Sequence, residues 1–187
     1  MMLRCIHKNE ISLQQRQQCL SLMAPQRRAQ VERITHSQTR ESSICGEWLA
    51  KTMLSEVSGQ AVEDISLARD QNGKPYAENL PLYFSISHSG EQVACVISDQ
   101  PVGLDIEEIA PRDPSVARRI CSEKEMEFIF SKEEDVLHRF LLVWTAKEAA
   151  VKLSGVGIKG MREVDYFALQ PRLETKIEDG CVISVVR

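Results

Sequence analysis

The stretch Val102-Gly103-Leu104-Asp105-Ile106-Glu107 decides the architecture of this chain, because apolar and acidic side chains alternate along it. Successive side chains of a β-strand point to opposite faces of the sheet. The alternation therefore predicts a strand with Leu104 and Ile106 on one face and with Asp105 and Glu107 on the other.

Asp105 and Glu107 would place two like charges about 7 Å apart along that strand. They repel each other unless a cation or water lies between them. Mg²⁺ suits such a pair, because it takes oxygen ligands from one or two carboxylates and from substrate phosphates. An ordinary solvent-facing strand shows the same alternation, so the pair alone leaves both interpretations open. Glu108 points the other way and is left out.

A second pair of charges lies in the helix predicted over residues 136–153. Apolar residues line one face up to Trp144, and Glu148 and Lys152 continue that line at intervals of four. A surface ion pair, which contributes only about 0.3–0.5 kcal/mol, explains the two charges but not their place at the end of an aromatic face. Lys147 points away from this line, and we expect it to face solvent.

The third motif is Ser85-Ile86-Ser87-His88-Ser89-Gly90, at the end of a predicted strand. Small hydroxyl side chains and a glycine let backbone N–H groups approach phosphate oxygens, and histidine can donate a hydrogen bond to them. A serine hydrolase is the rival, but it needs a G-x-S-x-G elbow or another orienting acid. No such elbow is present, and Ser87 and His88 would point to opposite faces. A plain strand end stays open as well.

Composition narrows the class of protein. The chain has 187 residues and a net charge of −4, which argues against a general nucleic-acid binder. Its N-terminus is polar and no apolar run approaches a membrane span, so we expect a cytoplasmic protein. None of the six cysteines forms a C-x-x-C pair, and we expect buried, reduced thiols.

The remaining pattern predicts mixed helix and strand in two halves. Helices are expected over residues 11–57, with a restart at Pro25, and over 114–130; strands are expected over 65–68, 82–87, 93–98 and 102–106, and in the tail from 164 to 186. The connector 98–101 is compatible with a hairpin between the strands that flank it. We place a boundary near Pro101, between an N-terminal lobe (1–100) and a C-terminal lobe (101–187).

Taken in order, Gly73-Lys74-Pro75, the Ser-His-Ser turn, the G-x-D-x-E strand and the W-x-x-K-E-x-x-x-K helix resemble the 4'-phosphopantetheinyl transferase superfamily. The resemblance is to the monomeric, two-lobed type that includes the surfactin-synthetase activator. It is firm over residues 72–160, looser over 24–60 and absent from the tail.

The resemblance implies an α/β fold of two similar lobes related by pseudo-twofold symmetry, with coenzyme A in the cleft between them. It implies an enzyme that transfers the 4'-phosphopantetheine moiety of coenzyme A to a serine of an apo carrier protein, with Mg²⁺, and releases 3',5'-ADP. Carrier proteins are typically acidic, so the arginine-rich region 11–40, or Arg118 and Arg119, is expected to face the carrier.

The resemblance also implies roles for single residues. Asp105, Glu107 and Glu148 match the acidic positions around Mg²⁺, and Lys152 matches the lysine near the α-phosphate. Asp105, Glu148 and Lys152 are therefore the expected catalytic residues. Glu148 is the candidate for activating the carrier serine, directly or through water, and whether it serves as base or as metal ligand stays open.

Four further residues match positions that contact coenzyme A in the family. Ser87 and His88 match the 3'-phosphate end, Lys74 matches another cofactor-contacting cation, and Arg27 matches a basic position used for the adenosine phosphate.

One departure concerns the residue four places before Gly46. The family usually has a phosphate-binding arginine there, whereas this chain has Ser42. Arg40 lies two residues earlier and is expected to substitute for it, unless the 3'-phosphate is held more weakly.

Three rivals remain. A non-catalytic coenzyme A-binding protein would keep Lys74 and His88 but would not need the three acids. A Mg²⁺-dependent phosphohydrolase would use the same acids without a carrier protein. A structural protein would leave the charged end of the Trp144 face unexplained.

Overall fold

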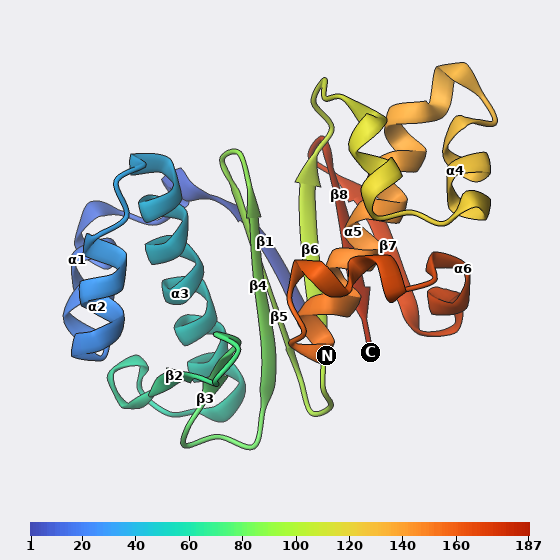
Figure 1. The fold of residues 1–187 in the computed structure, drawn as a ribbon. Helices are drawn as coiled ribbons and strands as arrows, with labels where there is room; N and C mark the ends of the chain where they lie inside the picture. The colour runs from blue at the N-terminus through green and yellow to red at the C-terminus, as the bar shows by residue number, and fades with distance from the viewer. The chain divides into compact units, whose positions relative to one another are not determined.

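The computed structural model describes the chain over residues 1–113, 115–157 and 160–187. The chain divides into two compact units, Met1–Pro101 and Val102–Arg187, which we call unit 1 and unit 2. Both units combine helices with strands, so the expected α/β class is confirmed (Figure 1). In the described part of the chain, no helix has the length and apolar character needed to cross a membrane.

Unit 1 is a three-stranded antiparallel sheet with helices stacked on one face (Figure 1). The sheet order is β1 (Met2–His7), β5 (Gln92–Ser98), β4 (Tyr83–Ser89). The long helix α3 (Ser37–Ser58) packs on β5 and β4, and α1 (Leu13–Leu22) and α2 (Pro25–Glu32) pack against α3. A two-stranded ribbon, β2 (Leu67–Arg69) and β3 (Pro75–Ala77), and the 3₁₀ helices η1 (Lys8–Glu10) and η2 (Val62–Asp64) complete the unit.

Local signals begin and end these helices. Ser12 accepts a hydrogen bond from the backbone N–H of Gln15, and the Gln15 side chain bonds back to Ser12, which makes a capping box for α1. Pro25 occupies the first turn of α2, where its missing N–H has no helical partner to lose. Gly59 ends α3 in the left-handed region, with φ 74°.

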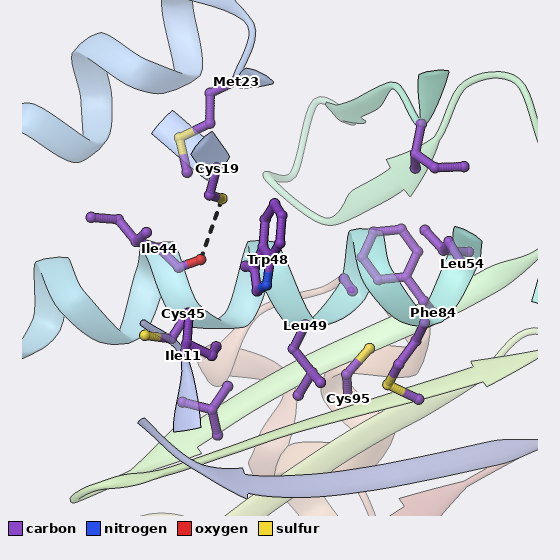
Figure 2. Close-up of a cluster of buried hydrophobic side chains, with 14 of the residues drawn as sticks. Ile11, Cys19, Met23, Ile44, Cys45, Trp48, Leu49, Leu54, Phe84 and Cys95 are labelled. Atoms are coloured by element: carbon purple, nitrogen blue, oxygen red, sulfur yellow. Dashed lines mark hydrogen bonds between the residues drawn. The ribbon is translucent and has the colours of Figure 1, made fainter. Parts of the chain in front are cut away.

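The core of unit 1 lies between α3 and the sheet (Figure 2). Trp48 and Leu49 of α3 are buried in the same cluster as Phe84 of β4. Cys19 of α1 joins them and its thiol donates to the backbone oxygen of Ile44 at 3.5 Å. Burial, and to a smaller extent the carboxylate of Glu47, raises the pKa of the Cys19 thiol to about 12. The thiol therefore stays protonated at neutral pH.

The cysteines of the chain are free thiols, as expected. Four of them are fully buried and two are partly buried; the buried ones are Cys19, Cys45, Cys95 and Cys181. They act as small apolar side chains in the two cores.

Unit 2 repeats the same plan with different residues. Its antiparallel sheet has the order β6 (Gly103–Glu108), β8 (Cys181–Val186), β7 (Leu173–Glu178). Helix α5 (Val136–Ser154) packs on β6 and β8, and α4 (Glu123–Phe130) packs on α5. The shorter helices are η3 (Pro114–Arg119), η4 (Glu133–Asp135), η5 (Ile158–Glu163), α6 (Tyr166–Leu169) and η6 (Gln170–Arg172).

Each unit therefore has one topology: a strand, a long helix that packs on the sheet, and a hairpin whose second strand takes the central place. In unit 1 these are β1, α3, β4 and β5, and in unit 2 they are β6, α5, β7 and β8. The two halves of the sequence show no repeat. The same order of paired strands requires a similar pattern of apolar residues but not the same residues.

The hairpin expected across residues 98–101 is wrong. Strand β5 pairs with β1 and β4, whereas β6 pairs with β8 from Gly103↔Val186 to Glu108↔Cys181. The true hairpin joins β4 to β5 at Gly90, which has φ 52°. A turn signal is local and cannot report that a strand some 75 residues further on supplies the partner.

Two other expectations need correction, and two strands were missed. The helix expected over 114–130 is broken, because Ser122 and Glu125 form a capping box that begins α4 at residue 123. The tail begins with the short helix α6 before the strands β7 and β8, which lie as expected around the turn at 179–180. The N-terminal strand β1 and the short strand β3 were not predicted.

Gly103 allows α5 to lie unusually close to β6. A Cβ atom at this position would lie 1.9 Å from the backbone oxygen of Ala149 and 2.6 Å from the backbone N of Leu153. Both atoms belong to the helix backbone, which cannot move aside as a flexible side chain could. Only glycine fits here, and the face of β6 that carries Gly103 is the face against α5.

A buried ion pair joins α4 to α5. Lys147 is wholly buried, and its ammonium group donates to both Glu125 carboxylate oxygens, at 2.9 and 2.8 Å. Glu125 also accepts from the backbone N–H groups of Ser122 and Tyr166. The expectation that Lys147 faces solvent is therefore wrong: α5 is covered on this side as well, and the charge is buried because it is paired and hydrogen-bonded.

Replacing Gly103 by alanine is expected to destabilise the protein by about 3 kcal/mol or more, because the new methyl group overlaps helix backbone. Gly59→Ala is the matched control. It places a Cβ where nothing lies within 4 Å, so it costs only the left-handed backbone conformation, about 1–2 kcal/mol. Urea unfolding measures both. An equal loss in the two variants would show that the close approach does not matter to stability.

Lys147→Met is expected to destabilise the fold by about 3–5 kcal/mol, because it leaves the Glu125 carboxylate buried without its counter-charge. Lys124→Met, in the same region, removes an exposed ammonium 4.4 Å from the ring centre of Phe167 and should cost less than about 1 kcal/mol. Thermal and urea unfolding compare the two variants. Similar values would mean that the buried pair contributes no more than a surface contact.

Candidate functional site

Unit 2 brings Asp105 and Lys152 together. Asp105 follows Gly103 by two residues on β6, so it lies on the same face, against α5. Only 4% of Asp105 is exposed, and the Lys152 ammonium donates to its Oδ1 at 2.7 Å. The two motifs that held these residues in the sequence, 47 residues apart, thus meet in one place.

Glu148 and Glu107 complete this acidic group. Glu148 lies one helical turn before Lys152 on α5, and Glu107 lies two residues after Asp105 on β6. Burial raises the pKa of Glu148, Asp105 and Glu107 raise it further, and Lys152 opposes them. The charge of Glu148 is therefore felt together with those of Asp105 and Glu107.

The chemistry of these donors fits a hard divalent cation such as Mg²⁺, which prefers carboxylate oxygens. Burial and the neighbouring carboxylates both disfavour the charged form of Glu148, and a bound cation would oppose both effects. In this structure the positive charge comes from side chains: Lys152 pairs with Asp105, and Arg112 pairs with Glu107 at 3.0 Å. Among the described residues, no three metal-ligating side chains stand close enough to form a finished metal cluster.

Unit 1 contains a cavity of about 610 Å³ between α2, α3, the β2–β3 ribbon and β4. Two arginines, one histidine, small residues and carboxylates line it. Its main polar lining residues are Arg27, Ser42, Glu47, Arg69, Asp70 and His88. A cavity of this size, polar and cationic in places, suits a phosphorylated organic ligand.

The structure places two of the predicted cofactor-contacting residues on the wall of this cavity and a third beside it. Arg27 and His88 line it, and Lys74 lies between two lining residues, Gly73 and Pro75. Burial lowers the pKa of Lys74, and Asp70 opposes the shift. Ser87 points to the other face of β4, is buried, and does not line the cavity.

Arg40 lies away from this group. It is exposed in the first turn of α3 and does not line the cavity. Ser42 is buried and does line it. The position where the family carries an arginine is thus a position at the cavity wall, and Arg40 does not fill it in this structure.

Two residues at the cavity were missed in the sequence. Glu47 is buried in α3 and accepts a 2.9 Å hydrogen bond from the Arg27 Nε. Arg69, at the end of β2, lines the cavity and donates to the backbone oxygen of Gly73 at 2.6 Å. Neither belongs to a motif, and only the packing of α2 and the β2–β3 ribbon around α3 brings them to the cavity.

Two family models match the chain. One, described as 4'-phosphopantetheinyl transferase, N-terminal, matches residues 9–100, and the other, described as the 4'-phosphopantetheinyl transferase superfamily, matches residues 101–178. Together they span both units.

Several curated relatives are also named 4'-phosphopantetheinyl transferase. The chain is 29% identical over 150 residues to the 4'-phosphopantetheinyl transferase Sfp of Bacillus subtilis, which covers 79% of this chain and 67% of the relative. It is 34% identical to psf-1 of Bacillus pumilus, over 71% of this chain and 58% of the relative. It is 39% identical to AcpT of Salmonella typhimurium, over 58% of each.

In these three relatives the matched part spans between 58% and 67% of their own length. The two family models cover the acidic group of unit 2 and the cavity of unit 1. The order of motifs, the two family models and the curated relatives agree, and the chain belongs to the 4'-phosphopantetheinyl transferase superfamily.

Proposed function

We propose that this chain transfers the 4'-phosphopantetheine moiety of coenzyme A to a serine of an apo carrier protein and releases 3',5'-ADP, with Mg²⁺. The observation that supports this most is the meeting of Asp105, Glu148 and Lys152 where α5 approaches β6 at Gly103. These groups are what phosphoryl transfer needs: oxygen ligands for a cation, a base and a fixed positive charge.

Asp105, Glu107 and Glu148 are the residues that would hold Mg²⁺. When bound, the ion would neutralise the charge of the pyrophosphate and polarise a phosphoryl oxygen. Buried Asp105 and half-buried Glu148 offer carboxylates whose mutual repulsion favours a cation between them. A phosphohydrolase would use the same groups, so the carrier must be tested directly.

In the proposed step the carrier serine oxygen bonds to the β-phosphorus of coenzyme A, and the bond from that phosphorus to the bridging oxygen breaks. Glu148 is the proposed acceptor of the serine proton, directly or through water. Lys152, held by Asp105 at 2.7 Å, stabilises the charge that develops on the leaving 3',5'-ADP.

The cavity of unit 1 is proposed to receive the nucleotide end of coenzyme A. Arg27 is fixed there by Glu47, so the guanidinium is already ordered before a phosphate binds. His88 lines the same cavity, and Lys74 lies in the turn beside it. These are the cations and hydrogen-bond donors that an adenosine phosphate requires.

Mass spectrometry of an apo acyl carrier protein incubated with this chain, coenzyme A and Mg²⁺ tests the reaction. The carrier should gain one phosphopantetheine, and EDTA should abolish the gain. Release of phosphate or phosphopantetheine without a carrier would favour the hydrolase. Binding of coenzyme A with no change in fatty-acid or peptide-synthetase carriers would favour a non-catalytic binding protein.

Asp105→Asn is expected to lower the rate at least about 100-fold and to leave the protein folded, because it keeps the size of the side chain and removes its charge. Glu108→Gln is the matched control, since Glu108 lies on the same strand but on the other face. Its rate should stay within about twofold of that of the wild type. Circular dichroism verifies the fold of both. A near-normal rate for Asp105→Asn would remove Asp105 from the site.

A further inference from the structure

Arg112 lies in the loop that follows β6, and two hydrogen bonds fix its guanidinium beside the acidic group of unit 2. Its Nη1 donates to Glu107 Oε2 at 3.0 Å, and its Nη2 donates to the backbone oxygen of Glu108 at 3.0 Å. The Arg112 side chain is 29% exposed and the Glu107 side chain 22%, so water screens this pair less than a surface pair. Arginine suits such a two-point attachment, because the donors of its planar fork have fixed directions.

Hydrogen bonds hold the loop that carries Arg112 on both sides of this residue. Before it, the N–H of Ile109 donates to the backbone oxygen of Gly180 at 2.8 Å, which ties the loop to the turn between β7 and β8. After it, the Asp113 side chain accepts from the N–H of Ser115 at 2.8 Å and begins η3. The guanidinium therefore extends from an anchored loop and can act as a fixed support for the carboxylate that it binds.

Glu107 needs such a support more than Asp105 does. Asp105 has a short side chain and is only 4% exposed, so packing against α5 restricts it. Glu107 has a longer side chain near the end of β6 and is only partly buried, yet its charge raises the pKa of Glu148 and so belongs to the same group. A carboxylate that is ordered beforehand loses less conformational freedom when it binds an ion.

We propose that Arg112 is a positioning residue for Glu107 and thereby sets the affinity of the acidic group for a divalent cation. The inference rests on the proposed function, in which Asp105, Glu107 and Glu148 hold Mg²⁺. The positive charge of Arg112 also repels such an ion, but water screens that repulsion at a partly exposed site. Orientation is the larger effect, because hydrogen bonds that orient a metal-binding side chain typically change metal affinity about 10- to 100-fold.

A titration of the full chain with Mn²⁺, followed by the electron paramagnetic resonance of the free ion, tests this directly. Coenzyme A is present at saturation, and a blank without protein corrects for the ion that coenzyme A binds by itself. Arg112→Gln should bind Mn²⁺ about 10- to 100-fold more weakly than the wild type. Arg112→Lys should lie between the two, because it keeps the charge but not the planar fork.

A kinetic readout and a control variant separate positioning from damage to the fold. In transfer to a carrier, Arg112→Gln should need more Mg²⁺ for the half-maximal rate, by the factor seen with Mn²⁺, and should reach the wild-type rate when Mg²⁺ is saturating. A damaged fold would lower the saturated rate instead. Arg187→Gln is the control: it removes an arginine whose partner, Glu174 of β7, lies outside the acidic group, and it should bind Mn²⁺ as the wild type does.

The other outcomes overturn the inference or the proposed function separately. Unchanged Mn²⁺ affinity in Arg112→Gln would overturn the inference, and tighter binding would show that Arg112 acts by repelling the ion. A wild type that binds no Mn²⁺ in the presence of coenzyme A would refute the proposed cation site together with this inference. A wild type that binds Mn²⁺ but modifies no carrier would refute the reaction alone, since the comparison of Mn²⁺ affinities still decides the role of Arg112.

Discussion

The contact between α5 and β6 at Gly103 is the constraint on which the acidic group of unit 2 depends. Because the helix backbone lies where a Cβ would be, at 1.9 Å from the Ala149 oxygen, only glycine allows this approach. The residues next to Ala149 and Leu153 in α5 are Glu148 and Lys152. The close contact therefore puts one carboxylate and one ammonium beside Asp105. The glycine that the packing requires is thus also needed for the acidic group to form.

Unit 1 has the same topology as unit 2, but the charged residues of its long helix have different partners. Its long helix α3 also carries a glutamate and a lysine four residues apart, Glu47 and Lys51, at the spacing of Glu148 and Lys152 in α5. In unit 1 Glu47 pairs with Arg27 at the cavity, and Lys51 is buried and donates to the backbone oxygen of Ile65. The same arrangement of helix and sheet thus carries a group of acids in one unit and a cavity lined by arginines and carboxylates in the other.

Much of the acidic group could be predicted from local pattern. Alternation on a strand placed Asp105 and Glu107 on one face, and intervals of four on a helix aligned Glu148 with Lys152. The same reasoning failed for Lys147, because a helical wheel assigns a residue to a face without saying whether another element covers that face. Here α4 supplies Glu125, and the lysine is wholly buried.

The sequence alone determined the family, the α/β class, the helices and strands that carry the motifs, and the residue types of the acidic group, because periodicity and motif order are properties of the chain itself. The tertiary structure decided which strands pair, why residue 103 must be a glycine, and which arginines line the cavity. Arg40 lies close to Ser42 in sequence, yet it is Arg69, 27 residues away, that lines the same cavity. Strands can pair, and a ribbon can pack beside a helix, at any separation along the chain. Local sequence patterns therefore do not show which distant residues come into contact.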